Sequence, residues 1–249
     1  MKNIIIILAL FLAFISCSKN DEPQPQPRLQ PQQQTVESVA KIKTISRGSG
    51  SSTYTYDMQG RLLKQEDSEG GKVTYTYSNN TVIENNYNAS STLVSTYAID
   101  LNADGLVIKK TLTFPTTTTY IFEYSYNTNK QLVQEIKKRG NPITVTSTVE
   151  YTYTANQLSS KKEYLSDGTL YLTSVFEYFT DKSNSMGFKN FGLLFYAEES
   201  DFPKKSEINT FSPTNSITDL YEYLYDSKNR ISKRITNGGS NGVNDITYY

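Results

Sequence analysis

The chain has 249 residues, and its 25 Lys plus Arg balance its 25 Asp plus Glu, so the formal net charge is zero. A balanced chain offers no basic field to attract nucleic acid, and no nucleic-acid partner is expected. There are 20 Tyr and 11 Phe but no His. Because His is the commonest general base and transition-metal ligand, we expect a protein that is not an enzyme and carries no cofactor.

Residues 1–16 have the features of a lipoprotein signal peptide. The apolar run from Ile4 to Ile15 is too short for a membrane-spanning helix, which needs about 20 residues. The run ends in the sequence FISC, which resembles a bacterial lipobox, and Cys17 is the only Cys of the chain. We therefore predict that Cys17 is lipidated and anchors the protein to the outer membrane. The alternative is an ordinary secretory signal with an incidental Cys.

Residues 17–35 form the predicted tether between this anchor and the folded part. Residues 18–22, SKNDE, resemble the export signal of Bacteroidetes surface lipoproteins, so the cell surface is favoured over the periplasmic face as the alternative. The Pro- and Gln-rich sequence from Pro23 to Gln34 cannot form a core and is typical of an extended, polyproline-like linker. Residues 36–249 are predicted to form a single domain.

A tyrosine-rich repeat organises that domain, and its first copy is YTYDMQGRL at residues 54–62. Side chains of a strand alternate between two faces, so Tyr54 and Tyr56 share one face while Thr55 takes the other. The following Asp and Gly supply turn chemistry, and connections this short join antiparallel neighbours. Further copies begin at Tyr97, Phe122, Val149 and Tyr221. The pattern predicts an all-β fold, a long antiparallel meander of repeated hairpins.

Charged residues follow the repeat with equal regularity. Glu residues separate the aromatic positions, and paired Lys or Arg residues mark the return strands at 109, 110, 137, 138, 161, 162, 233 and 234. We interpret both sets as a solvated outer face of cross-strand pairs, for example Glu222 with Arg234. A catalytic pair of carboxylates is the disfavoured alternative, because it requires convergence in a cleft.

The segment Asp100-Leu101-Asn102-Ala103-Asp104-Gly105 matches the start of a calcium loop. The twelfth position of such a loop requires Glu, and here it is Thr111. We therefore interpret the segment as a hairpin turn, with Asp100, Asn102 and Asp104 as a weak calcium site in the alternative.

The repeat is interrupted between Lys182 and Lys205 by the most apolar stretch outside the signal sequence. The spacing of its aromatic residues predicts one short helical insert near residues 188–197, which plugs the open end of the sheet. The functional alternative is an aromatic lip for a ligand. Its candidate residues are Phe188, Phe191, Phe195 and Tyr196.

The segments YTYDMQGRLLK and YEYLYDSKNRISKR resemble the tyrosine-aspartate (YD) repeats of Rhs-type proteins. From about residue 39 onwards, the chain resembles an uncharacterised Bacteroidetes lipoprotein family with a DUF4595 domain and a porin-like fold. Residues 202–205, FPKK, stand where that family has a Leu-Pro-Lys-type segment. The resemblance implies a curled antiparallel sheet, a partly or fully closed barrel, and no activity. Because the outward positions lack an apolar band, we expect this barrel to be soluble.

Two functions agree with these features. The first is a non-catalytic, membrane-tethered surface lipoprotein, a binding or structural module for a carbohydrate or protein ligand. The second is a periplasmic carrier or chaperone that shelters an apolar ligand inside the curled sheet. A hydrolase using Asp or Glu alone is the third and least favoured reading.

Overall fold

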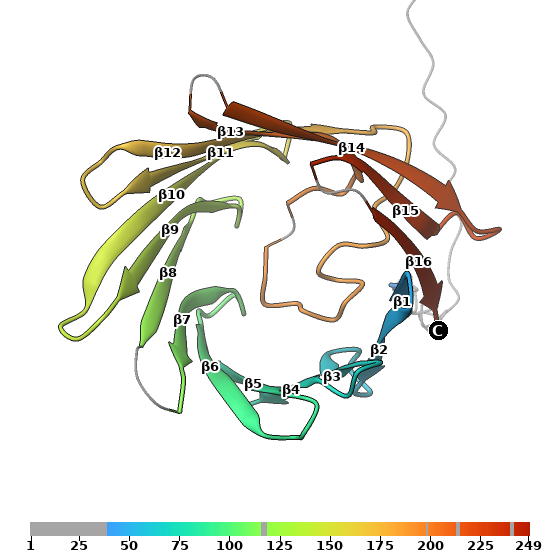
Figure 1. The fold of residues 1–249 in the computed structure, drawn as a ribbon, viewed down its shortest axis with the longest axis horizontal. Coiled ribbons are helices and arrows are strands. Elements are labelled where there is room, and N and C mark those ends of the chain that lie inside the picture. The colour runs from blue at the N-terminus through green and yellow to red at the C-terminus, as the bar shows by residue number, and fades with distance from the viewer. Residues whose placement is uncertain (1–38, 116–118, 198, 213–214, 240–241) are drawn as a thin grey trace, which may run out of the picture. The chain divides into compact units, whose positions relative to one another are not determined.

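Tyr-rich strands build a closed barrel in the computed structural model, which describes residues 39–249 apart from 116–118, 198, 213–214 and 240–241 (Figure 1). Within this part of the chain there are sixteen strands and no helix. They are β1 (Ile42–Arg47), β2 (Gly50–Tyr56), β3 (Leu62–Asp67), β4 (Lys72–Tyr77), β5 (Thr81–Tyr87), β6 (Leu93–Leu101), β7 (Val107–Thr113), β8 (Tyr120–Tyr126), β9 (Leu132–Arg139), β10 (Thr144–Thr154), β11 (Gln157–Leu165), β12 (Leu170–Tyr178), β13 (Lys204–Ser212), β14 (Asn215–Tyr225), β15 (Ile231–Gly238) and β16 (Gly242–Tyr248).

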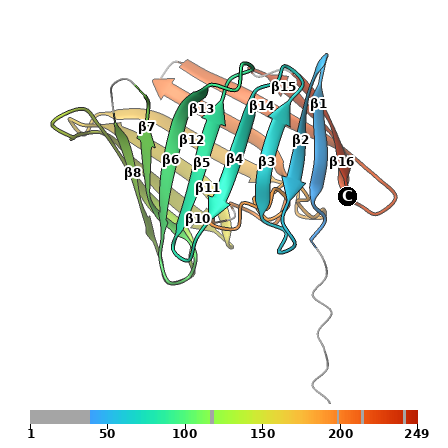
Figure 2. The same ribbon diagram turned by 90° about the horizontal axis from the view of Figure 1, so that it is seen from below.

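The strands follow one another around the barrel in sequence order, each antiparallel to its neighbours. β1 pairs with β16, with Ile45 opposite Ile246, so the barrel is fully closed. Figure 2 shows the tilted strands from the side. The predicted antiparallel meander and its curling into a barrel therefore agree with the structure. No helix in the described residues is long and apolar enough to cross a membrane.

The hairpin turns owe their shape to an Asp or Asn side chain at the end of the outgoing strand. Oδ1 of Asp57 accepts hydrogen bonds from the backbone amides of Gln59 and Arg61 at 3.0 and 2.8 Å. Gly60 completes this turn with φ +74°, a conformation that costs Gly little. Asn102, Asn127 and Asp226 accept the same two backbone hydrogen bonds in later repeats.

A β-bulge follows each of these four turns, and a fifth follows the tight turn of Ala155 and Asn156 between β10 and β11. Tyr56 lies opposite Leu62 while Thr55 lies opposite Lys64, so Leu63 is an extra residue on the return strand. The extra residues at the other four places are Ile108, Val133, Ser159 and Ser232. Because the bulge shifts the alternation by one position, the next inward side chain lies three residues after the first, not two.

This shift corrects the predicted outer face. Arg234 lies opposite Tyr223 and faces the lumen, whereas its neighbour Lys233 faces outward and forms an ion pair with Asp245 at 3.2 Å. Glu222 lies opposite Ile235, so the expected pair of Glu222 with Arg234 is wrong. Of the paired basic residues, those that point inward are Lys110, Lys137, Lys161 and Arg234.

Residues 179–203, here called the plug, leave the wall after β12 and fold inside the barrel (Figure 1). The predicted helix at 188–197 is wrong, because the described residues there form successive turns. Gly192 adopts φ +70°, which is outside the helical region. The carbonyls of Asn190, Gly192 and Phe195 accept hydrogen bonds from the wall instead of closing helical turns.

The plug fills one end of the barrel. Odd-numbered strands all run in the same direction, so their first residues gather at that end. The amides of Ile42, Leu62 and Val107 donate to the plug carbonyls of Asn190, Gly192 and Phe195 at 3.2, 3.2 and 3.0 Å. The amides of Leu158 and Ile231 likewise donate to Glu199 O at 2.8 Å and Ser185 Oγ at 2.7 Å. The apolar core lies here, in two clusters around Phe191 and Phe195.

Candidate functional site

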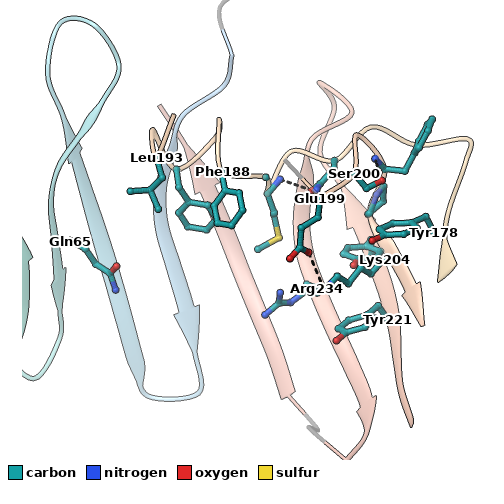
Figure 3. A pocket seen from close by; sticks show the side chains of 16 residues that line it. Gln65, Tyr178, Phe188, Leu193, Glu199, Ser200, Lys204, Tyr221 and Arg234 are labelled. Atoms are coloured by element: carbon teal, nitrogen blue, oxygen red, sulfur yellow. Dashed lines mark hydrogen bonds and ion pairs between the residues drawn. The ribbon is translucent and has the colours of Figure 1, made fainter. Parts of the chain in front are cut away.

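A pocket of about 400 Å³ lies between the plug and the wall formed by β12 to β15 (Figure 3). Its volume is within the range of pockets that hold small organic ligands. The wall contributes Tyr178, Lys204, Tyr221, Tyr223 and Arg234, and β3 contributes Gln65. The plug contributes Asn184, Met186, Gly187, Phe188, Phe191, Leu193, Glu199, Ser200, Phe202 and Pro203. The pocket therefore lies at the inner face of the plug.

One side of the pocket is apolar, and ring contacts hold its aromatic residues in place. The ring of Phe191 packs edge-on against Tyr54 of β2, with centroids 5.4 Å apart. The ring of Phe188 packs against Tyr196 at 5.0 Å. Met186 and Leu193 complete this surface. A preformed surface of this kind suits an apolar or aromatic group.

The opposite side carries polar groups that the protein leaves without partners. Nε of Arg234 and the hydroxyl of Tyr178 are buried, and neither forms a hydrogen bond with any described residue. Burial, followed by the charge of Glu199, raises the pKa of Tyr178, so this hydroxyl stays protonated and able to donate. Buried donors without acceptors cost free energy, and such groups call for a partner.

Lys204 is the second cation of the pocket, and it is already neutralised. Its Nζ lies 3.4 Å from a carboxylate oxygen of Glu199 and 3.4 Å from one of Glu207. Burial raises the pKa of Glu207, but the charge of Lys204 and a hydrogen bond from Asn209 bring it below its ordinary value. Burial and the same carboxylate raise the pKa of Tyr221 to about 12, and its hydroxyl donates to Glu207 at 3.3 Å.

The four aromatic residues predicted to form a ligand lip separate into two pairs. Phe188 and Phe191 line the pocket. Phe195 is buried against Val82, Ile99 and Val107 as part of the core. The hydroxyl of Tyr196 accepts a hydrogen bond from Nζ of Lys110 at 2.6 Å, on the far side of the lumen from Arg234. Only the first pair is therefore placed to touch a ligand in this pocket.

The alternation of the sequence does not predict the polar residues of the pocket. Arg234 and Gln65 each lie three residues after the first apolar residue of a return strand, Ile231 and Leu62. The same offset leads from Val107 to Lys110. In a regular strand, inward side chains are two residues apart. A spacing of three residues at the start of a return strand therefore indicates the bulge, and with it the charged or polar residue that points inward.

The predicted calcium residues form one of the repeated turns. Oδ1 of Asn102 accepts hydrogen bonds from the amides of Asp104 and Leu106 at 3.0 and 2.9 Å. Asp104 forms an ion pair with Lys130 at 2.8 Å. Among the described residues, no group of three or more Asp, Glu or Cys side chains is arranged to hold a metal ion. Cys17, the predicted lipidation site, lies outside the described residues.

Two crystal structures of porin-like proteins share this fold. The protein from Bacteroides uniformis superposes with a TM-score of 0.60 and 13% identity, over 85% of this chain and 97% of that chain. The protein from Bacteroides vulgatus superposes with a TM-score of 0.59 and 9% identity, over 84% of this chain and 99% of that one. The porin-like fold implied by the sequence resemblance is thus confirmed. No family model matches the chain, and no curated protein is detectably similar to it.

Proposed function

We propose that this protein is a non-catalytic binding module that holds a small organic molecule in the lumen of its barrel. The pocket of about 400 Å³ carries the proposal, because it combines a rigid apolar side with buried donors that lack acceptors. A purely structural barrel wall would not be stabilised by buried donors that lack hydrogen-bond acceptors, so these donors indicate a ligand. The sheltered, partly apolar site also suits the carrier function considered above.

The proposal attaches the barrel to the outer membrane through lipid on Cys17, at the cell surface, with the periplasmic face as the alternative. Its support is the FISC sequence, the SKNDE segment and the Pro- and Gln-rich linker. Ion pairs on the outward positions, such as Lys138 with Glu123 at 2.7 Å, favour a barrel wall in water, because a lipid-facing wall needs an apolar band. The DUF4595 and YD-repeat relationships remain predictions.

A glycan ligand is the second candidate. Tyr171 of β12 is 47% exposed, and its ring packs edge-on against Phe211 of β13 with centroids 6.2 Å apart. The exposed ring of Tyr171 offers a flat surface against which a sugar ring packs. The pair lies at the ends of β12 and β13 that are away from the plug, because the plug follows Tyr178 and ends before Lys204.

Dye binding tests the lumen proposal directly. The full chain is reconstituted in lipid nanodiscs and titrated with the neutral dye N-phenyl-1-naphthylamine, with empty nanodiscs of the same lipid subtracted. We expect saturable fluorescence with one dye per chain, and about tenfold weaker binding by Phe188→Ala, since an aromatic contact surface is lost. Met58→Ala is the control, because this turn residue is 99% exposed. Absence of saturable binding by the folded protein would reject lumenal binding.

A further inference from the structure

We propose that the lumenal pocket selects a monoanionic ligand with an apolar body, whose carboxylate or sulfonate-type group pairs with the guanidinium of Arg234 and accepts a hydrogen bond from the hydroxyl of Tyr178. This inference rests on the proposed function and specifies the chemistry of the same site. Both groups line the pocket, and both are buried without a hydrogen-bond partner at Nε and at the hydroxyl.

Arg234 can be compared with the three other basic residues that point into the lumen, of which Lys161 lies over the ring of Phe176 at 5.7 Å. Lys110 donates to Tyr196 at 2.6 Å and lies over the ring of Tyr97 at 4.4 Å. Lys137 pairs with Glu163 at 2.9 Å, beside a separate small pocket of β9 to β12. Among the described residues, none forms an ion pair with Arg234. Arg234 is half-buried, and its buried Nε lacks an acceptor, which an anion from outside the chain can supply together with the opposite charge.

The charge of the pocket indicates one negative charge on the ligand. Lys204 is shared between Glu199 and Glu207, which more than neutralise it. This group keeps one excess negative charge, so its three side chains together with Arg234 are neutral. Arg234 is nevertheless the one among them without an oppositely charged partner, so it can pair with a single negative charge of a ligand. A dianion such as a phosphate monoester would lie in the same pocket as the carboxylate of Glu199, and like charges in a confined site repel. The geometry therefore favours a carboxylate or another monoanion.

The orientation of the ligand follows from the two sides of the pocket. Arg234 extends into the lumen from β15, and Gln65 extends toward the same space from β3 (Figure 3). Phe188 and Met186 border this space from the plug. The charged group lies against Arg234 in the wall, and the apolar body lies against the plug. The Gln65 amide, which both donates and accepts, is placed to contact a polar substituent between them.

A pair of dyes that differ only in charge tests this inference. 1-Anilinonaphthalene-8-sulfonate is a monoanion, and N-phenyl-1-naphthylamine is the same ring system without the sulfonate. Both are titrated against the full chain in nanodiscs, in the wild type, Arg234→Gln and Lys233→Gln. Lys233 is the matched control, because it is the adjacent cation on the opposite face of β15 and pairs with Asp245.

We expect Arg234→Gln to weaken binding of the sulfonate dye about tenfold or more, because a hydrogen-bonded charge pair is lost. Binding of the neutral dye should change less than about twofold, and Lys233→Gln should change neither affinity. Tyr178→Phe removes a single hydroxyl, and it should weaken binding of the sulfonate dye but not binding of the neutral dye. If Arg234→Gln does not fold, Tyr178→Phe still tests whether the pocket binds the anionic group.

The outcomes separate the two proposals. Saturable binding of both dyes that neither Arg234→Gln nor Tyr178→Phe alters would overturn the anion selectivity and leave lumenal binding in place. Saturable binding of neither dye would overturn lumenal binding itself. Equal weakening by Arg234→Gln and Lys233→Gln would assign the effect to overall charge and also reject the specific role of Arg234.

Discussion

The hydroxyl of Tyr77 donates a hydrogen bond to the carbonyl oxygen of Leu62 at 2.7 Å. The amide of Leu62 in turn donates to the plug carbonyl of Gly192 at 3.2 Å. Equivalent tyrosine-to-carbonyl bonds join Tyr56 to Ile42, Tyr126 to Val107 and Tyr248 to Ile231. At each of these four places, the plug accepts a hydrogen bond from the amide of the first residue of a wall strand, and a Tyr hydroxyl donates to the carbonyl of the same residue.

Removing one such hydroxyl should lower stability without changing the fold. We expect Tyr77→Phe to reduce the free energy of unfolding by about 1 kcal/mol, because the carbonyl oxygen of Leu62 loses the hydrogen bond that the hydroxyl donates. Urea unfolding followed by far-UV circular dichroism measures the change. Tyr171→Phe is the control, since this exposed ring shows no hydroxyl bond, and an equal loss in both would contradict the prediction.

Gly192 is the plug residue least able to accept a side chain. A Cβ at this position would lie 2.6 Å from the carbonyl oxygen of Gly60 and 2.7 Å from the amide nitrogen of Leu62, and φ is +70°. We expect Gly192→Ala to lower the free energy of unfolding by about 3 kcal/mol or more, through backbone strain and displacement of the plug from the wall.

Gly168→Ala separates strain from crowding. Gly168 has φ +83°, but a Cβ there would meet nothing within 4 Å. Gly168→Ala should lower the free energy of unfolding by about 1 kcal/mol, because Ala is disfavoured in the left-handed conformation. Thermal unfolding of both variants measures the difference, and similar losses would show that the plug does not lie against β3 as described.

Ser185 caps the amide of Ile231 in place of a plug carbonyl. Its Oγ accepts from that amide at 2.7 Å and lies 2.9 Å from the hydroxyl of Tyr248. Ser185→Ala should lower the free energy of unfolding by about 1–3 kcal/mol, because it leaves a buried amide without an acceptor. Amide hydrogen exchange at Ile231 should also accelerate relative to wild type. Unchanged protection of that amide would reject the assignment.

The acidic limit of stability should depend on the turn carboxylates. Burial raises the pKa of Asp226, but hydrogen bonds from the Arg230 amide and guanidinium more than offset it, and the pKa falls below its ordinary value of 3.8. A carboxyl whose pKa is lower in the folded state than in the unfolded state stabilises the fold at any pH above the unfolded-state pKa. This contribution is lost as the pH falls through the folded-state pKa. We expect wild-type stability to decline below about pH 4.

Asp226→Asn should reduce the slope of that decline. Asn does not titrate, and Asn127 shows that it accepts the same two backbone hydrogen bonds. The free energy of unfolding of this variant, measured by urea titration from pH 7 to pH 2, should depend less on pH in the acidic range than that of wild type. A parallel decline in both proteins would mean that other groups govern acid unfolding.

Much of the fold follows from local pattern. The alternation around Tyr54 and Tyr56 predicts their inward face, and Asp57 predicts the turn. The inward turn of Arg234 does not follow, because a bulge inserts Ser232 and reverses the alternation that the sequence suggests. Which residue becomes the extra one depends on pairing with the neighbouring strand, not on its own propensity.

The conformation of the plug is the second feature that the local sequence does not predict. The spacing of Phe188, Phe191 and Phe195 is compatible with a helix, yet tertiary contacts determine the conformation. The carbonyl of Asn190 accepts from the amide of Ile42, and the carbonyl of Phe195 accepts from Val107. Such partners lie far away in the sequence, so no local window contains the information that overrides the helical spacing. The pocket itself depends on the same long-range contacts.

The position of the plug between β12 and β13 sets an order on biosynthesis. When the ribosome has completed β1 to β12, the residues that receive the amides of Ile42, Leu62 and Val107 have not yet been made. The tyrosine face of β1 to β12 therefore stays uncovered without the residues up to 203, and the seam of β1 with β16 needs the last strand of the chain. A chain that ends before the plug would expose a long sheet with open edges, so we expect it to aggregate more readily than the full chain.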